Sequence, residues 1–198
     1  MSAKPLLLVA LESEVPMTIT ERWNVVFTGV GKINASYALM KALTSYRPSL
    51  LINYGTAGGI TPQTKKVVQV GQVLQCDMDV RPLGVALGST PFDSCPASIE
   101  LSAGTPFSAS TRFSDSLVRC GTADKFSDTP PELACDIVDM ELYALAKIAW
   151  HENIPLMAFK YISDDADDKA AAQWKNNLPA SVRAFEEIEP TLHALIQR

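Results

Sequence analysis

Segments typical of buried β-strands alternate with segments typical of amphipathic helices along this chain. Several of the strand-like segments are continuous apolar runs, which is the pattern of strands covered on both faces. The expected strands are PLLLVAL (5–11), WNVVFTG (23–29), SLLINYG (49–55), VVQVGQVLQCDMDV (67–80), SLVRCGTA (116–123) and PLMAFKYIS (155–163). The alternation predicts a single α/β domain over residues 1–198, with a mixed, mostly parallel sheet.

Three segments predict helices. The first, residues 31–46, carries an apolar stripe on one face, made up of Ile33, Tyr37, Met40 and Leu43. The second, residues 137–153, begins extended and then becomes a helix with an apolar side, formed by Leu142, Leu145, Ala146 and Ala149. The third covers residues 179–198, with Pro190 as a candidate bend. Residues 81–113 are dense in Gly, Pro, Ser and Thr, which predicts loops and short antiparallel strands.

The composition excludes several classes of protein. A net charge of −5 with scattered basic residues argues against a nucleic-acid-binding surface, so a small-molecule ligand is expected. The apolar run 5–11 is far shorter than the roughly 20 residues of a membrane-spanning helix. Glu12 and Glu14 follow it, where a signal peptide would have small residues. We therefore expect a cytoplasmic protein without a nucleic-acid or membrane partner.

The cysteines do not indicate a metal or redox motif, because their spacing is too wide for CxxC patterns. They are expected to be reduced and buried, at positions Cys76, Cys95, Cys120 and Cys135.

Two glycine-rich motifs each follow an expected strand. TGVGK (28–32) has a glycine pair like that of a dinucleotide fingerprint, but Asn34 stands where the third glycine would be. A tight turn therefore explains this motif about as well as ligand contact does. GTAGG (55–59) has three glycines, where a plain turn rarely needs more than one. Such a segment lets the backbone approach a ligand closely, and we favour ligand contact there.

Acidic residues gather where expected strands end, the place where ligands bind in open α/β sheets. They lie in LESE (11–14), VDMELYA (138–144) and SDDADD (163–168). In VDMELYA, Asp139 can cap the adjacent helix and Glu141 can favour its positive end. Hydrogen bonding to ligand hydroxyls explains the same two acids equally well.

The aspartates of SDDADD leave three alternatives open at this point. The stretch lacks the spacing and the glycine of a calcium loop, but a magnesium site needs only one or two carboxylates. A helix cap at Ser163 or Asp164 and an acid placed against a substrate are the other two. The remaining acids of the stretch are expected to be solvated: Asp165, Asp167 and Asp168.

Taken together and in order, these motifs resemble the purine nucleoside phosphorylase and nucleosidase superfamily. The similarity is strongest to the 5′-methylthioadenosine/S-adenosylhomocysteine nucleosidases. The matching stretches are VALESEV, TGVGKINAS, LINYGTAGG, VGQVLQCDMDVRPLG, GTADKF, VDMELYA and KYISDDAD. The resemblance implies a three-layer nucleoside phosphorylase-like fold, with a central mixed, mostly parallel sheet flanked by helices. It also implies a hydrolase that cleaves adenine from a 5′-modified adenosine, without a cofactor or a metal.

The resemblance further implies a role for each matching residue. Glu14 helps to activate the attacking water, Glu141 binds the ribose hydroxyls, and Asp164 protonates the leaving base. An aspartate at this last position suits a 6-amino purine, which favours adenine. The other implied substrate contacts are Thr56, Ala57, Gly58, Phe126, Ser127, Met140, Lys160 and Trp174. A homodimer is implied as well, whose neighbouring subunit lines the 5′ pocket with Val80, Leu83 and Val85.

The chemistry of the reaction fits these acids. Breaking an N-glycosidic bond builds positive charge on the sugar and negative charge on the departing base. Carboxylates stabilise the sugar, and a protonated acid relieves the charge on the base. An aspartate needs burial or hydrogen bonding to stay protonated, and the end of a buried strand supplies burial. On this interpretation Asp164 is a general acid and no metal is required.

The sequence departs from the family pattern at several positions, and these differences leave other functions possible. Lys160 stands where bacterial relatives have arginine, which keeps the charge and loses the two-pronged geometry. The segment between Glu14 and Thr28 is shorter than in the family, so the preferred 5′ group stays open. Trp174 stands where an apolar lid residue is expected, although plain packing explains it nearly as well. The alternatives, in order, are a phosphate-dependent purine nucleoside phosphorylase, a non-catalytic nucleoside-binding protein and a magnesium-dependent phosphohydrolase.

Overall fold

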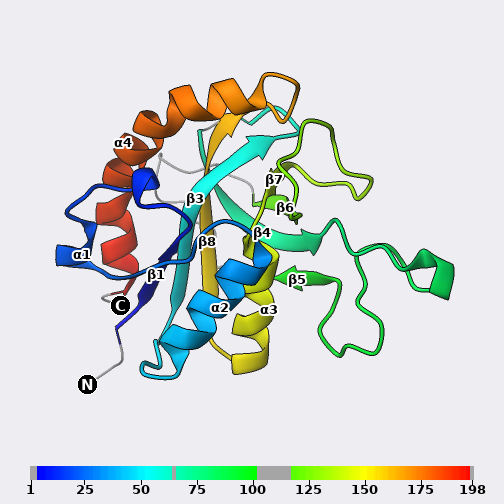
Figure 1. Ribbon diagram of the computed structural model, residues 1–198. Coiled ribbons are helices and arrows are strands. Elements are labelled where there is room, and N and C mark those ends of the chain that lie inside the picture. Colours follow the sequence, from blue (N-terminus) through cyan, green and yellow to red (C-terminus); the bar gives the residue numbers. More distant parts are fainter. Residues whose placement is uncertain (1–3, 64–65, 102–116, 197–198) are drawn as a thin grey trace.

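The structure is a computed structural model and describes residues 4–63, 66–101 and 117–196. Within these residues eight strands form one sheet (Figure 1). They are β1 (Leu6–Val9), β2 (Asn24–Phe27), β3 (Leu51–Gly59), β4 (Val67–Gln75), β5 (Ser98–Glu100), β6 (Val118–Thr122), β7 (Ile137–Asp139) and β8 (Leu156–Asp164). All six segments expected to be strands contain one, which confirms the sequence-based assignment.

The sheet is mixed and mostly parallel, and part of it closes on itself. β1 pairs in parallel with β2 and with β3. β8 lies parallel to β3 and antiparallel to β4, and β4 continues through β6 to β7 in parallel pairs. β7 then pairs antiparallel with β3, so β3, β8, β4, β6 and β7 form a closed, barrel-like circuit. β5 adds an antiparallel edge to β4.

Helices cover both faces of the sheet, which gives the three layers that the family resemblance implies. They are α1 (Ile19–Arg22), α2 (Lys32–Leu43), α3 (Leu142–Glu152) and α4 (Ala170–Ile196), with short 3-10 turns η1 (Glu12–Glu14) and η2 (Arg81–Leu83). α2 and α3 lie side by side on one face, and α1 and α4 lie on the other (Figure 1). The predicted fold class is confirmed.

The apolar strands contribute to the hydrophobic cores on both faces of the sheet because successive side chains point to opposite faces. In β1, Leu6 and Leu8 pack in the core under α2 and α3, while Leu7 and Val9 pack in the core under α4. The continuous apolar run at 5–11 therefore reflects a strand covered on both sides. The four residues predicted for the apolar side of the second helix are all buried in α3: Leu142, Leu145, Ala146 and Ala149.

Two helices differ from the sequence-based expectation. α4 begins at Ala170 rather than at Pro179, and both Pro179 and Pro190 lie inside it. Its orange first part and red last part run in different directions (Figure 1). In α2 the packed residues are Ala35 and Leu39, whereas most of the predicted apolar stripe is turned to the outside. Ile33 is 80% exposed and Tyr37 is 69% exposed.

The four cysteines are free; three are buried and Cys76 is partly exposed. Within the described part of the chain, no helix combines the length and the apolar character needed to cross a bilayer.

Candidate active site

The ends of several strands surround one cavity, with a volume of about 180 Å³. The cavity is bounded by the turn after β1, the last residues of β3, and the segments that follow β6, β7 and β8. This is the place that ligands occupy in α/β sheets. It is lined by every site residue predicted for the chain's own pocket: Glu14, Thr56, Ala57, Gly58, Phe126, Ser127, Met140, Glu141, Lys160, Asp164 and Trp174.

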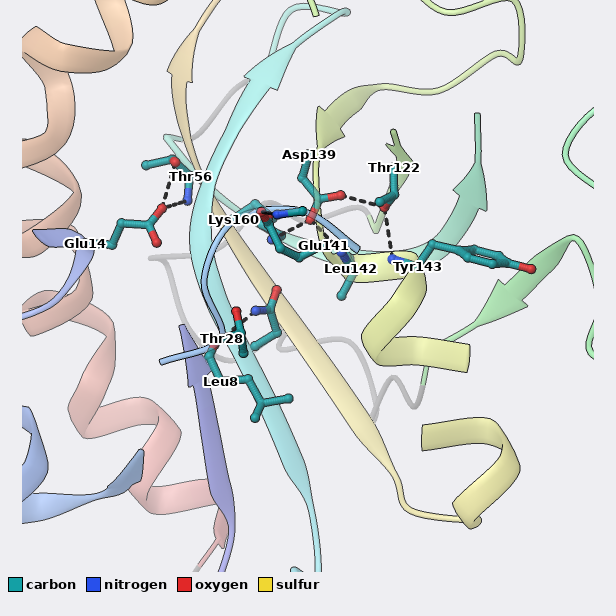
Figure 2. A network of polar contacts seen from close by, with 12 residues as sticks. Leu8, Glu14, Thr28, Thr56, Thr122, Asp139, Glu141, Leu142, Tyr143 and Lys160 are labelled. Carbon is teal, nitrogen blue, oxygen red and sulfur yellow. Dashed lines mark hydrogen bonds and ion pairs between the residues drawn. The ribbon is translucent and has the colours of Figure 1, made fainter. Parts of the chain in front are cut away.

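Glu14 lies in η1, directly after β1, and its carboxylate points at β3 (Figure 2). Its Oε1 accepts hydrogen bonds from the Thr56 amide at 2.7 Å and from the Thr56 hydroxyl at 2.8 Å. Its Oε2 accepts one from the Leu11 amide at 3.1 Å. Although Glu14 is only 2% exposed, these donors compensate the burial of its carboxylate.

The GTAGG motif lies inside β3, whereas the sequence suggested a loop after a strand. Its glycines let acidic side chains approach the strand backbone. A methyl group on Gly58 would lie 2.8 Å from Asp164 Oδ1, which is closer than a methyl carbon comes to an oxygen without one of them moving. A methyl group on Gly55 would lie 3.4 Å from Glu14 Oε1. The close approach inferred from the sequence is therefore present, and protein carboxylates make it.

Asp139 ends β7 and forms the centre of a buried polar network (Figure 2). Its Oδ1 accepts a hydrogen bond from the Thr122 hydroxyl at 2.6 Å. Its Oδ2 accepts from the Leu142 amide at 3.0 Å and lies 2.8 Å from the Nζ of Lys160. Asp139 thus bonds the first turn of α3, as the capping interpretation expected, and also neutralises a buried cation.

Lys160 is 1% exposed and is the only Lys or Arg among the buried residues that the structure describes. Because its ammonium is paired with Asp139, it is less available to a ligand than the predicted substrate contact implied. Burial lowers the pKa of Lys160, but the Asp139 carboxylate, together with Cys120 and Glu141, outweighs it and raises the pKa, so the ammonium stays charged.

Glu141 follows β7 by two residues and lines the cavity. Its Oε1 accepts a hydrogen bond from the Gly31 amide at 2.8 Å. Gly31 has a positive φ of 89°, which glycine adopts without strain, and this turn aims the amide at the carboxylate. Burial, together with the neighbouring Asp139 carboxylate, raises the pKa of Glu141 to about 7. Lys160 and the Gly31 amide oppose that shift.

Asp164 ends β8 and is buried, with 7% of its surface exposed. The Ser163 hydroxyl donates to its Oδ2 at 2.7 Å, and the Ala166 amide donates to its Oδ1 at 3.1 Å. Burial raises the pKa of Asp164 and outweighs these two donors, which lower it. A raised pKa is the property that a general acid needs.

The other aspartates of SDDADD face outward. Asp165 and Asp168 are exposed, as the sequence predicted, whereas Asp167 is half-buried. In the described ranges, no cluster of three or more His, Cys, Asp or Glu side chains is arranged to hold a metal ion.

The remaining lining residues close the cavity from the sides. Phe126 and Ser127 lie on the segment after β6, and Phe126 is 45% exposed. Lys32 anchors this segment, because its ammonium lies 3.7 Å from Asp124, which belongs to the segment, and also contacts Asp77. Trp174, on α4, points its indole nitrogen at Thr56, with an Nε1 to Oγ1 distance of 3.1 Å.

The residues predicted for the neighbouring subunit lie away from this cavity, on the segment between β4 and β5. This segment extends from the body of the molecule, at the right of Figure 1. Leu83 is 72% exposed there, while Val80 and Val85 are half-buried.

Sequence reasoning missed two residues that shape the site. The sequence predicts Asp139 as a helix cap or a ligand acceptor, because nothing in its local sequence reveals that Lys160 lies beside it. The sequence predicts Ser163 only as a candidate cap, whereas in the structure its hydroxyl donates to the carboxylate of its sequence neighbour Asp164. Its position directly before the acid was the available signal.

Three carboxylates from separate elements therefore face one cavity: Glu14, Glu141 and Asp164. Such an arrangement can stabilise positive charge on a bound sugar. The pKa of Asp164 is raised, so this residue is suited to proton donation.

Two relatives found by sequence comparison carry the same enzyme name. A 5′-methylthioadenosine/S-adenosylhomocysteine nucleosidase of Marinomonas sp. is 28% identical over 169 residues, which cover 76% of this chain and 71% of the relative. The enzyme of the same name from Geobacillus thermodenitrificans is 25% identical over 187 residues, which cover 86% and 78% of the two chains.

Solved structures support the fold. The nucleosidase of the same name from Helicobacter pylori, with butyl-thio-DADMe-Immucillin-A, has a TM-score of 0.84 at 16% identity, covering 98% of this chain and 99% of that one. Futalosine hydrolase from Helicobacter pylori has a TM-score of 0.82 at 16% identity, covering 93% and 94%. The sequence profile of the phosphorylase superfamily matches residues 17–196. The chain belongs to the phosphorylase superfamily.

Proposed function

We propose that this protein is a nucleosidase that hydrolyses the N-glycosidic bond of a 5′-modified adenosine. Methylthioadenosine, S-adenosylhomocysteine or a related nucleoside is the substrate, and adenine and the free sugar are the products. The observation that carries the proposal is the convergence of Glu14, Glu141 and Asp164 on one cavity. The names of the curated relatives support the same reaction. Residues 1–198 act as one domain in this proposal, with no cofactor and no metal.

The acid at the base is Asp164. In its protonated form it donates a proton to N7 of adenine while the bond between N9 and the anomeric carbon breaks. The bonding electrons go to the purine, so the proton neutralises the charge that develops there. Burial of Asp164 favours the protonated form that this step requires. An aspartate also accepts from the 6-amino group, which favours adenine over a 6-oxo purine.

The sugar is held by Glu141 and attacked by water from the side of Glu14. The ionised Glu141 accepts from the ribose hydroxyls and stabilises the positive charge on the sugar. Glu14 accepts a proton from the water as its oxygen bonds to the anomeric carbon. Phe126 stacks on the adenine ring, Ser127 offers backbone contacts beside it, and Met140 lies against the sugar.

Lys160 has an indirect role in this proposal. Its ammonium is bound to Asp139, so it fixes the buried polar network rather than reaching the ligand. It also supplies positive charge behind Glu141, which keeps part of the Glu141 population ionised near neutral pH.

Two observations favour water over phosphate as the nucleophile. A phosphorylase needs cations that converge on a phosphate ion, and the buried cation that the structure describes at this cavity is already neutralised by Asp139. Glu14 would also repel the anion at the place where the nucleophile approaches. A non-catalytic nucleoside-binding protein would have no need of three acids around the sugar and the base.

A cytoplasmic homodimer completes the proposal. The exposed apolar stripe of α2, with Ile33, Tyr37 and Met40, is an unusual surface for a monomer and continues toward the cavity mouth at Val30. The extended segment between β4 and β5 would reach the neighbour's 5′ pocket with Val80, Leu83 and Val85. The neighbouring subunit would then supply the wall that the short segment between Glu14 and Thr28 does not provide.

The proposal is tested by identifying the sugar released from methylthioadenosine with and without phosphate, in buffer containing EDTA. Hydrolysis predicts adenine and the free sugar in both conditions. Formation of sugar 1-phosphate, and only with phosphate present, would establish the phosphorylase alternative. Loss of turnover on chelation would indicate a metal.

A further inference from the structure

We propose that Trp174 is a positioning residue for the water-activating carboxylate of Glu14, which it holds through the hydroxyl of Thr56. The inference rests on the proposed hydrolysis. It assigns the indole N–H of Trp174 a task in catalysis that is separate from closing the cavity.

The direction of the hydrogen bonds follows from the donors present. An indole nitrogen can only donate, so Trp174 Nε1 donates to Thr56 Oγ1 across 3.1 Å. The hydroxyl of Thr56 has a single proton, and the acceptor at 2.8 Å is Glu14 Oε1. The two hydrogen bonds therefore point in one direction, from the indole to the hydroxyl and from the hydroxyl to the carboxylate. The indole occupies a lone pair of the Thr56 hydroxyl oxygen, so the hydroxyl proton points away from Trp174 and toward Glu14.

The consequence is that the two oxygens of Glu14 are not equivalent. Oε1 accepts from both the amide and the hydroxyl of Thr56, at 2.7 and 2.8 Å. Among the residues that the structure describes, Oε2 accepts only from the Leu11 amide, at 3.1 Å. Since a carboxylate oxygen has two lone pairs, Oε2 keeps one for the attacking water. Trp174 thus helps to decide which oxygen receives the proton.

Helix α4 holds Glu14 at a second point. The hydroxyl of the fully buried Ser181 lies 3.4 Å from the backbone oxygen of Glu14. Ser181 is itself fixed, because its backbone oxygen accepts from the Tyr54 hydroxyl at 2.7 Å. One helix therefore positions both the backbone and the side chain of Glu14.

Trp174→Phe separates the positioning role from plain packing, because phenylalanine keeps an aromatic ring over the cavity and lacks the N–H. We expect kcat to fall about 3- to 10-fold, the size of one hydrogen bond, with KM changed less than about twofold. Trp150→Phe is the matched control, because Trp150 lies on α3 and is 41% exposed outside the cavity. Its kcat should equal that of the wild type.

Thr56→Val tests the connection to Glu14. It removes the bond from the hydroxyl to the carboxylate and should lower kcat about 10- to 100-fold. When Thr56→Val is already present, Trp174→Phe should cause no further loss of kcat, because the hydrogen bonds that connect Trp174 to Glu14 are already interrupted. The readout independent of turnover is hydrogen exchange of the Trp174 indole N–H by NMR, assigned from the signal missing in Trp174→Phe. Exchange should be slow in the wild type and faster in Thr56→Val.

Additive losses in the double variant, or wild-type kcat in Trp174→Phe, would overturn the inference while leaving the proposed function intact. A rapidly exchanging Trp174 indole in the wild type would also overturn it. A wild-type protein that cleaves no adenosine derivative would overturn the proposed function, and this inference with it.

Discussion

The Nζ of Lys160 lies 2.8 Å from Oδ2 of Asp139, and both side chains are almost completely removed from solvent. Both residues line the cavity; Lys160 comes from β8 and Asp139 comes from the end of β7. The pair joins β8, which ends at the proposed proton donor Asp164, to the end of β7, two residues before the proposed ribose-binding Glu141. Its loss should therefore be visible in stability as well as in activity.

Lys160→Met should lower the free energy of unfolding by about 3–5 kcal/mol, because it leaves the Asp139 carboxylate buried without a counter-ion. Denaturant unfolding measures this. Arg47→Met is the control, since it breaks an ion pair with Glu152 at the surface and should cost less than about 1 kcal/mol. Removing both charges in Lys160→Met with Asp139→Leu should recover part of the loss. A loss no greater than that of Arg47→Met would contradict the buried-pair account.

Glu141 should make the protein less stable as pH rises toward neutrality. Its pKa is raised to about 7 in the folded state, above its ordinary value of 4.5. The stabilisation that Glu141 adds to the free energy of unfolding is therefore complete below about pH 4.5 and is lost as pH rises through 7. The loss is on the order of 3 kcal/mol. Glu141→Gln should remove it, so the stability gained by this variant should grow between pH 5 and pH 8. If the difference in stability between Glu141→Gln and the wild type does not depend on pH, Glu141 does not titrate in this range.

Gly58→Ala should displace Asp164 and reduce turnover. The added methyl group would lie 2.8 Å from Asp164 Oδ1 and 3.1 Å from the Ala166 side chain, so the acid must move. A misplaced acid loses much of its effect, and we expect at least a tenfold fall in kcat. Gly55→Ala, in the same strand, brings its methyl group no closer than 3.4 Å to its neighbours and should cost much less. Equal losses in the two variants would argue against steric displacement of Asp164.

Tyr37→Glu should separate the proposed dimer, because it places a charge in the exposed apolar stripe of α2. Light scattering should give a dimer for the wild type and a monomer for the variant. KM for a 5′-substituted adenosine should rise in the monomer. Thr20→Glu, on α1 at the other face, should stay dimeric. A wild-type monomer with full activity at low concentration would exclude the dimer.

The sequence predicts the strands and the two helix-covered faces, because apolar runs and helical periodicity are local signals. PLLLVAL shows this most clearly, since both faces of β1 are buried. The start of α4 is wrong in the prediction, because proline normally favours the first turn of a helix and α4 contains Pro179 and Pro190 in its interior. The strand character of GTAGG was missed because glycine normally disfavours strands. In β3 the glycines are needed where Asp164 and Glu14 approach the backbone.

Contacts between side chains that are distant in the sequence could not be predicted from such local signals. Asp139 and Lys160 are far apart in the sequence, and no local pattern indicates that their side chains meet. The same holds for the bond from Trp174 to Thr56, which depends on how α4 crosses the end of β3. The order of the motifs along the chain, through the family resemblance, did identify the residues that line the cavity.

The claim that Asp164 is the general acid is tested most directly by comparing adenine release from methylthioadenosine by Asp164→Asn and Asp165→Asn. Asparagine keeps the shape of the side chain but cannot donate a carboxylic proton, so Asp164→Asn should lose about 10²- to 10⁴-fold in kcat. Asp165 is exposed and bonded to Gln173, so Asp165→Asn should stay close to the wild type. Near-normal turnover by Asp164→Asn would contradict the account.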